Sequence, residues 1–183
     1  MTTELVNVIT KWAIDPMHSE VEFKVKNLLI STITGRFRNF ECYVESPNED
    51  FTDAHISFNL DVNSIDTNQP QRDAHLKSND FFNAEQYPKI WFRSTSFYKI
   101  NTEYYKLQGE LTIRDITRHV ELDVIYGGQT YDSFNNHRAG FEVSGVINRK
   151  DFNIWWDERN VLGNQVVSDE VKLHMNIQLI EQR

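Results

Sequence analysis

Few side chains in this 183-residue chain have the types and spacing that chemistry requires, and two histidines stand out. His18 lies in a short turn-like stretch after Asp15, and His75 lies three residues after Arg72. Histidine exchanges protons near neutral pH, and arginine donates hydrogen bonds to anionic or carbonyl groups. His18, Arg72 and His75 are therefore candidates to bind the polar head of a ligand. The alternative is structural, in which these groups organise a turn and tie a helix to the end of the domain.

Other catalytic arrangements have little support in the sequence. His55, His119 and His174 fall on the polar side of alternating segments, which indicates surface positions. The histidines lack the close pairing of a zinc site, so we expect no bound metal. The chain has neither a nucleophile elbow nor a glycine-rich phosphate loop, and we assign no catalytic residue. The lone cysteine, Cys42, shares the parity of apolar neighbours and is predicted to be a small buried hydrophobic residue.

The composition excludes some classes of partner. The formal net charge is −8, which argues against a nucleic-acid surface and gives no general attraction to anionic membranes. No segment is long and apolar enough to predict a transmembrane helix. The first residues lack the features of a signal peptide, so we expect a cytoplasmic protein, or a periplasmic one if a leader has been removed. A single cysteine fits a reducing compartment.

The elements that must position these groups are strands. Most of the chain alternates apolar and polar residues with a period of two, which is typical of strands with one buried face. We expect a single domain over residues 1–183, with residues 1–10 as a loose extension. About eight long strands at hairpin-like spacing predict an antiparallel all-β fold, either an up-and-down barrel or a two-sheet sandwich. Residues 28–44 are expected to be extended, with Gly35 marking a bend or bulge.

Residues 68–88 break this alternation after the third long strand and predict a short helical insertion. Thr67 or Asn68 is expected to cap the helix, and Pro70 suits its first turn. A second turn is expected to carry Phe81 and to end at Pro88, because proline interrupts a helix. A second irregular stretch contains the pair 155–156, two tryptophans that we interpret as a lid or as an anchor for a subunit interface.

The inward-facing residues decide whether the domain is solid or hollow. The chain contains 12 Phe, and five of them fall on the inward parity of their strands. A barrel of about eight strands either fills its own interior or holds one small ligand, and spacing alone does not separate these outcomes. The predicted lining residues are Phe23, Val25, Phe37, Ile56, Phe58, Leu60, Phe92, Leu107, Leu111, Leu122, Phe141, Val143, Leu173 and Ile177.

In the order and spacing of its motifs, the chain resembles the YceI-like family of bacterial polyisoprenoid-binding proteins from about Trp12 to Leu179. The resemblance implies an eight-stranded antiparallel lipocalin-like barrel whose apolar bore holds a long isoprenoid chain, with the polar head towards the opening. Homodimers are common among such proteins. The matching segments are residues 12–19, 23–28, 34–37, 64–67, 72–82, 87–88, 109–114, 147–152 and 168–171.

Two departures from the family pattern bear on the bore. Asp115 and Asn153 stand where the family usually has glycine, so the turn at Asp115 is expected to differ. The first hypothesis is a non-enzymatic carrier of an isoprenoid, quinone-like or fatty lipid, without any other cofactor. The second is an enzyme that acts on a lipid or quinone with His18 or His75 as the acid–base group. The third is a solid barrel that serves as an interaction or stress protein.

Overall fold

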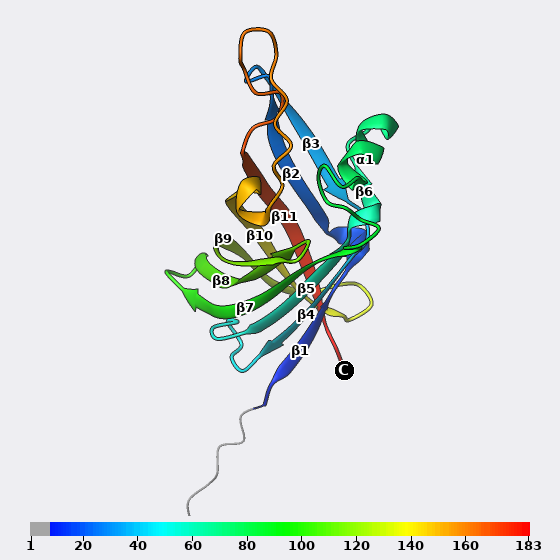
Figure 1. The fold of residues 1–183 in the computed structure, drawn as a ribbon. Helices are drawn as coiled ribbons and strands as arrows, with labels where there is room; N and C mark the ends of the chain where they lie inside the picture. Colours follow the sequence, from blue (N-terminus) through cyan, green and yellow to red (C-terminus); the bar gives the residue numbers. More distant parts are fainter. Residues whose placement is uncertain (1–7) are drawn as a thin grey trace, which may run out of the picture.

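The fold is a closed antiparallel β-barrel, seen in a computed structural model that describes residues 8–183 (Figure 1). A pairing between β1 and β11, with Trp12 opposite Glu181, joins the two ends of the sheet. The predicted barrel is therefore confirmed, and the sandwich is excluded. The strands of the ring, in their order around it, are β1 (Thr10–Ile14), β4 (Phe40–Ser46), β5 (His55–Asp61), β7 (Lys89–Lys99), β8 (Tyr104–Ile113), β9 (Ile116–Tyr131), β10 (His137–Asn148) and β11 (Glu170–Glu181).

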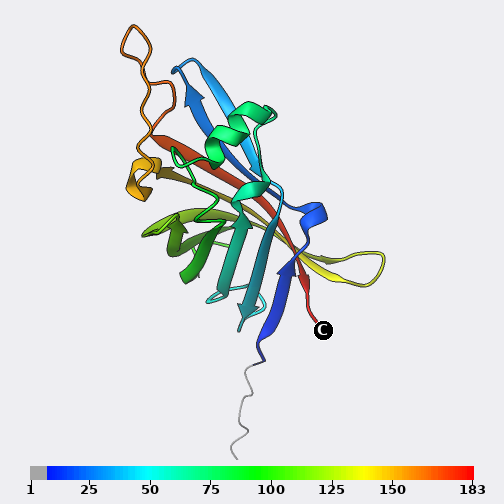
Figure 2. The ribbon, with the colours of Figure 1, turned by 45° about the vertical axis from the view of Figure 1, so that its right-hand side comes forward.

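The first long strand is interrupted, and this interruption shapes one end of the barrel. The 3-10 turn η1 (Pro16–His18) separates β1 from β2 (Glu20–Asn27), and β11 pairs with both strands in succession. β2 continues beyond the ring as a hairpin with β3 (Ser31–Phe37), whose far edge pairs with the short β6 (Ile65–Asp66). In both views this hairpin projects from the end of the barrel opposite the C-terminus (Figures 1 and 2).

The structure corrects several details of the sequence prediction. Residues 28–44 do not form one extended segment, because a turn at 28–30 and an irregular link at 38–39 divide them between strands. Gly35 marks no bulge, since the register of β2 with β3 runs without a shift from residue 31 to residue 37. Thr10 already belongs to β1, so it is not part of a loose extension, and residues 1–7 of that prediction lie outside the described residues.

The helical insertion is present as α1 (Pro70–Lys77), with Pro70 in its first turn as predicted. Its N-cap is Gln69, whose side-chain oxygen accepts a hydrogen bond from the N–H of Arg72. The predicted caps were wrong: Thr67 bonds instead to Asp73, and Asn68 takes a positive φ of 65°. Residues 78–88 form non-helical turns, so the predicted second helical turn is also wrong.

A long connection from β10 to β11 lies at the same end of the barrel as α1. The 3-10 helix η3 (Arg149–Phe152) opens it, and residues 153–169 then form an extended hairpin beside the turn between β2 and β3 (Figures 1 and 2). Several contacts join this connection to the β2–β3 hairpin. The N–H of Leu28 donates to the carbonyl of Val166 over 3.1 Å, Asn27 forms a β-bridge with Val167, and the N–H of Ser168 donates to the carbonyl of Lys26 over 3.1 Å. No helix within residues 8–183 is long and apolar enough to cross a membrane.

Candidate ligand-binding site

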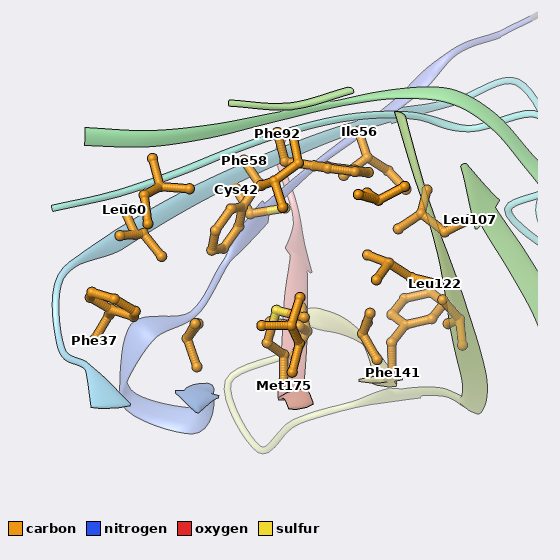
Figure 3. Close-up of a pocket in the computed structure, with 18 of the residues that line it drawn as sticks. Phe37, Cys42, Ile56, Phe58, Leu60, Phe92, Leu107, Leu122, Phe141 and Met175 are labelled. Carbon is orange, nitrogen blue, oxygen red and sulfur yellow. The ribbon is translucent and has the colours of Figure 1, made fainter. Parts of the chain in front are cut away.

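The barrel encloses an apolar cavity of about 160 Å³ (Figure 3). Its wall contains side chains from β2 to β5 and from β7 to β11. Among the described residues that line it, Glu22 is the sole charged one, and its carboxylate lies 3.0 Å from the guanidinium of Arg36. The chemistry of the wall is therefore that of a hydrocarbon solvent, which suits an apolar ligand and offers almost no polar recognition.

The exposure of inward-facing residues along β11 shows that the interior is hollow. Leu179, near the C-terminal end of the strand, is only 2% exposed. Leu173, Met175 and Ile177 point to the same interior but are only half-buried. They line empty space instead of packing against side chains across the barrel axis, and Figure 3 shows Met175 facing the cavity. The cavity therefore widens towards the start of β11.

Aromatic side chains seal the other end of the barrel. Phe51 is 1% exposed, and its ring centre lies 5.0 Å from those of Trp12 and Phe141. Tyr105 is equally buried, stacks on Phe97 and donates its hydroxyl to the carbonyl of Asp50 over 2.6 Å. Buried aromatic groups whose polar atoms are paired form a stable plug. The cavity is therefore closed at this end.

Glycines in the wall keep the cavity open. A Cβ atom at Gly35 would lie 2.2 Å from the Phe23 ring, so this ring lies flat over the backbone of the neighbouring strand. Gly109 provides the same room for Phe92, and Gly145 for Leu122. Large side chains cover the wall in this way instead of extending across the axis. This arrangement explains how a barrel rich in Phe retains an empty interior.

The structure places almost all of the predicted lining residues around the cavity. Of that set, only Val25 lies outside it, because Val25 pairs with Ile33 in the part of the β2–β3 hairpin that projects beyond the ring. The sequence reasoning missed other lining residues, although most share the inward parity of their strands. They are Val21, Glu22, Cys42, Val44, Phe51, Ile90, Phe97, Ile113, Val120, Val124, Ile147, Met175 and Leu179.

The three headgroup candidates do not line the cavity, and the structure does not bring them together. The Nδ1 atom of His18 lies 2.7 Å from the carboxylate of Asp15, and most of its side chain is exposed. Asp15 also accepts a hydrogen bond from Arg138 over 2.7 Å, so this group fixes the turn between β1 and β2. Arg72 is equally occupied, because it donates to the hydroxyl and the carbonyl of Thr67.

His75 belongs to α1, at the end of the barrel opposite the aromatic plug (Figure 1). Its Nε2 atom is 2.8 Å from the carboxylate of Asp80, and its ring packs edge-on against Phe81 and Trp156. Trp156 thus links the 153–169 connection to the segment after α1. Trp155 points elsewhere, is 60% exposed and donates to Asn153 over 2.7 Å. The interface role of this pair stays a prediction.

Arg149 anchors the connection that carries Trp156. Its side chain is almost fully buried and donates hydrogen bonds to the carbonyls of Ile154, Trp156, Val167 and Ser168. These carbonyls belong to both limbs of the connection. A single guanidinium therefore holds the two limbs together at the base of the hairpin, in addition to the β-bridge between Arg159 and Gln165. Burial lowers the pKa of this guanidinium.

The two departures from the family pattern have local explanations. Asn153 takes a positive φ of 62° at the end of η3, a conformation that asparagine tolerates. In the β8–β9 turn, Arg114 takes the positive φ of 57°. Asp115 is not among the residues with positive φ, so a carboxylate there imposes no backbone strain. The guanidinium of Arg114 reaches back to the carbonyls of Asn79 and Phe81 and holds that segment against the barrel.

Reactive groups at the site are limited to one thiol. Cys42 lines the cavity, and burial raises its pKa to about 12, so it is a neutral thiol at physiological pH. Within residues 8–183 no group of three or more potential metal ligands is placed to hold an ion.

A second, more polar recess of about 580 Å³ lies behind the aromatic plug, between His137, Glu181 and Gln129. The plug separates this recess from the apolar cavity.

Comparisons with known proteins agree with the fold. The model of the YceI-like domain matches residues 12–179. A UPF0312 protein of Pectobacterium carotovorum is 35% identical over 166 residues, which cover 91% of this chain and 83% of the relative. The crystal structure of BcnA from Burkholderia cenocepacia has a TM-score of 0.78 at 21% identity and covers 90% of this chain and 98% of its own. The structure of a polyisoprenoid binding domain from Saccharophagus degradans has a TM-score of 0.71 at 12% identity. This match covers 93% of the present chain and 98% of that domain's chain.

Proposed function

Because the chain belongs to the family of YceI-like domains, we propose that its barrel carries a lipid with an apolar tail, an isoprenoid in the first place, without catalysis. The observation that carries this proposal is the empty apolar cavity. The name of the related Saccharophagus degradans domain suggests the ligand class to test. Quinone-like and fatty lipids have the same tail chemistry and belong to the same class of candidates.

The size of the cavity defines what enters without rearrangement. A cavity of about 150 Å³ takes a benzene-sized group, so about 160 Å³ takes roughly one isoprene unit. A longer tail requires flexible lining side chains, Met175 above all, to move towards the wall. Each buried methylene contributes about 0.8 kcal/mol, so every further unit that is admitted strengthens binding considerably. The polar head would remain outside, at the end opposite the aromatic plug.

The positions of the reactive groups favour carriage over catalysis. A general acid or base must come within hydrogen-bonding reach of the atom it serves. His18 and His75 both lie outside the cavity and already contact carboxylates. The Cys42 thiol is held in its protonated, unreactive form. An empty interior also argues against the solid barrel of the third hypothesis.

Native mass spectrometry of protein purified without added lipid tests the proposal. We expect an apolar passenger, or uptake of a short prenyl alcohol by the delipidated protein. Met175→Trp should fill the cavity and reduce the bound lipid at least tenfold. Val146→Trp is the matched control, because Val146 is 57% exposed on the outside of β10. If neither a passenger nor uptake is detected, or if both variants bind like the wild type, the proposal is wrong.

A further inference from the structure

Two neighbouring turns at the end of the barrel opposite the aromatic plug expose large apolar side chains to solvent. Leu29 and Ile30, between β2 and β3, are 60% and 84% exposed. Leu162 is 81% exposed and Val161 is fully exposed, at the end of the 153–169 hairpin. The two turns project in the same direction (Figures 1 and 2). We call Leu29, Ile30, Val161 and Leu162 the apolar tip.

The apolar tip itself carries no charged side chain. The guanidinium of Arg159, which donates to the carbonyl of Gly163 over 2.9 Å, is paired with Asp157. The ammonium of Lys26 donates to the hydroxyl of Thr32 at the base of the other turn. Residues 27–35 and 160–167 contain no Asp, Glu, Lys or Arg, although charged residues make up 25% of the chain and its net charge is −8. A surface that is both apolar and uncharged fits a partner that is itself electrically neutral.

Leu28 and Leu29 occupy a turn whose backbone conformation is unfavourable for leucine. Both have positive φ, 52° and 64°, and the N–H of Ile30 donates to the carbonyl of Asn27 over 3.1 Å. This is the pattern of a type I′ turn, which favours Asn-Gly because bulky residues are strained at positive φ. The neighbouring hairpin places a glycine, Gly163, at its own positive φ of 82°. Leu28 is half-buried, but Leu29 is strained and exposed at once, and strain without burial points to a function of its side chain.

The shape of the apolar tip selects its partner. A stable protein–protein interface buries about 800 Å² of surface on each partner, and two narrow convex turns do not supply this area. A lipid surface needs only a few apolar side chains that enter the boundary between headgroups and acyl chains. We propose that the apolar tip docks the barrel on an electrically neutral lipid bilayer. The choice of a bilayer rests on the proposed function, because the cavity widens towards this end and its cargo would pass to or from the membrane.

Cosedimentation with phosphatidylcholine vesicles tests this docking. The variant Leu28→Asn/Leu29→Gly installs the residues that the turn prefers, so we expect its thermal midpoint to be equal or higher. The partition coefficient of this variant onto vesicles should fall about tenfold or more. A tenfold fall corresponds to a loss of about 1.4 kcal/mol in the free energy of transfer to the vesicle. Leu162→Ser should weaken binding independently. Phe134→Ser is the control, because Phe134 is 85% exposed in the β9–β10 turn at the opposite end.

Two further measurements separate the possible outcomes. The passenger detected by native mass spectrometry should be unchanged in the tip variants, so that loss of docking is distinguished from loss of cargo binding. Binding should also be insensitive to salt and no stronger on phosphatidylglycerol vesicles. The proposal is overturned if the wild type does not bind vesicles or if Phe134→Ser weakens binding as much. It is also overturned if sedimentation shows that the tip variants turn a dimer into a monomer.

Discussion

Replacing Gly35 by alanine should narrow the cavity by moving a single ring. The new Cβ would lie 2.2, 2.4 and 2.9 Å from three carbons of the Phe23 ring, whereas ordinary contacts begin near 3.4 Å. The ring tip must therefore move by about 1.2 Å (3.4 − 2.2). The wall lies behind the new methyl group, so the ring must move into the cavity. Gly35 has no positive φ in this structure, so alanine brings no backbone strain.

The expected magnitude has two parts. Overpacking a well-ordered site destabilises the folded protein by about 1–3 kcal/mol. Alanine offsets about 0.4–1 kcal/mol of this loss, because it makes the unfolded chain less flexible than glycine does. The free energy of unfolding should therefore fall by about 1–2 kcal/mol. If the ring excludes only two methylenes of a bound tail, the binding free energy falls by about 1.6 kcal/mol, or roughly 15-fold in Kd.

Urea unfolding and displacement of a fluorescent fatty-acid probe measure the two parts. In Gly35→Ala/Phe23→Ala the ring is absent, and the double variant should bind the probe better than Gly35→Ala alone. Gly140→Ala is the control, because no described atom outside its chain neighbours lies within 4 Å of the added Cβ. Wild-type affinity in Gly35→Ala, or no recovery in the double variant, would refute the idea that glycines hold the cavity open.

Three further predictions follow from contacts around the barrel. Trp156→Ala should speed the exchange of bound lipid and expose the 153–169 connection to protease. Trp155→Ala, which removes an exposed ring, should do neither. Equal exchange rates in both variants would contradict the bridging role of Trp156. The Asp132 carboxylate accepts hydrogen bonds from a backbone N–H of the β9–β10 turn and from a guanidinium, which hold its pKa well below 3.8. A carboxylate whose pKa is lower in the folded than in the unfolded protein stabilises the fold above the unfolded pKa, and this stability is lost as the pH falls. The free energy of unfolding should therefore decrease as the pH is lowered from about 4 to about 2, and Asp132→Asn should flatten this dependence. A thiol with a pKa of about 12 is ionised in about one molecule in 10,000 at pH 8, so Cys42 should react with a maleimide far more slowly in the native protein than in urea; equal rates would show that the thiol is not buried.

Local sequence period was enough to predict the strands and the side on which most of their residues lie. Neighbours in a strand point to opposite faces, so the lining position of Phe58 or Leu107 could be inferred from parity alone. Val25 shows the limit of this reasoning. It has the inward parity of β2 but lies beyond the ring, because the length of a strand does not reveal how far it continues past its neighbours.

Long-range contacts decided the features on which function depends. The closure of the barrel joins Trp12 to Glu181, almost the whole chain apart, and no local pattern specifies that pairing. The empty interior depends on Gly35 lying directly behind Phe23, a cross-strand register that the spacing of the apolar residues does not reveal. The headgroup candidates show a second limit of the sequence. Sequence shows which side chains are able to bind a polar group, but only the folded backbone determines whether a nearby residue already holds them, as Asp80 holds His75.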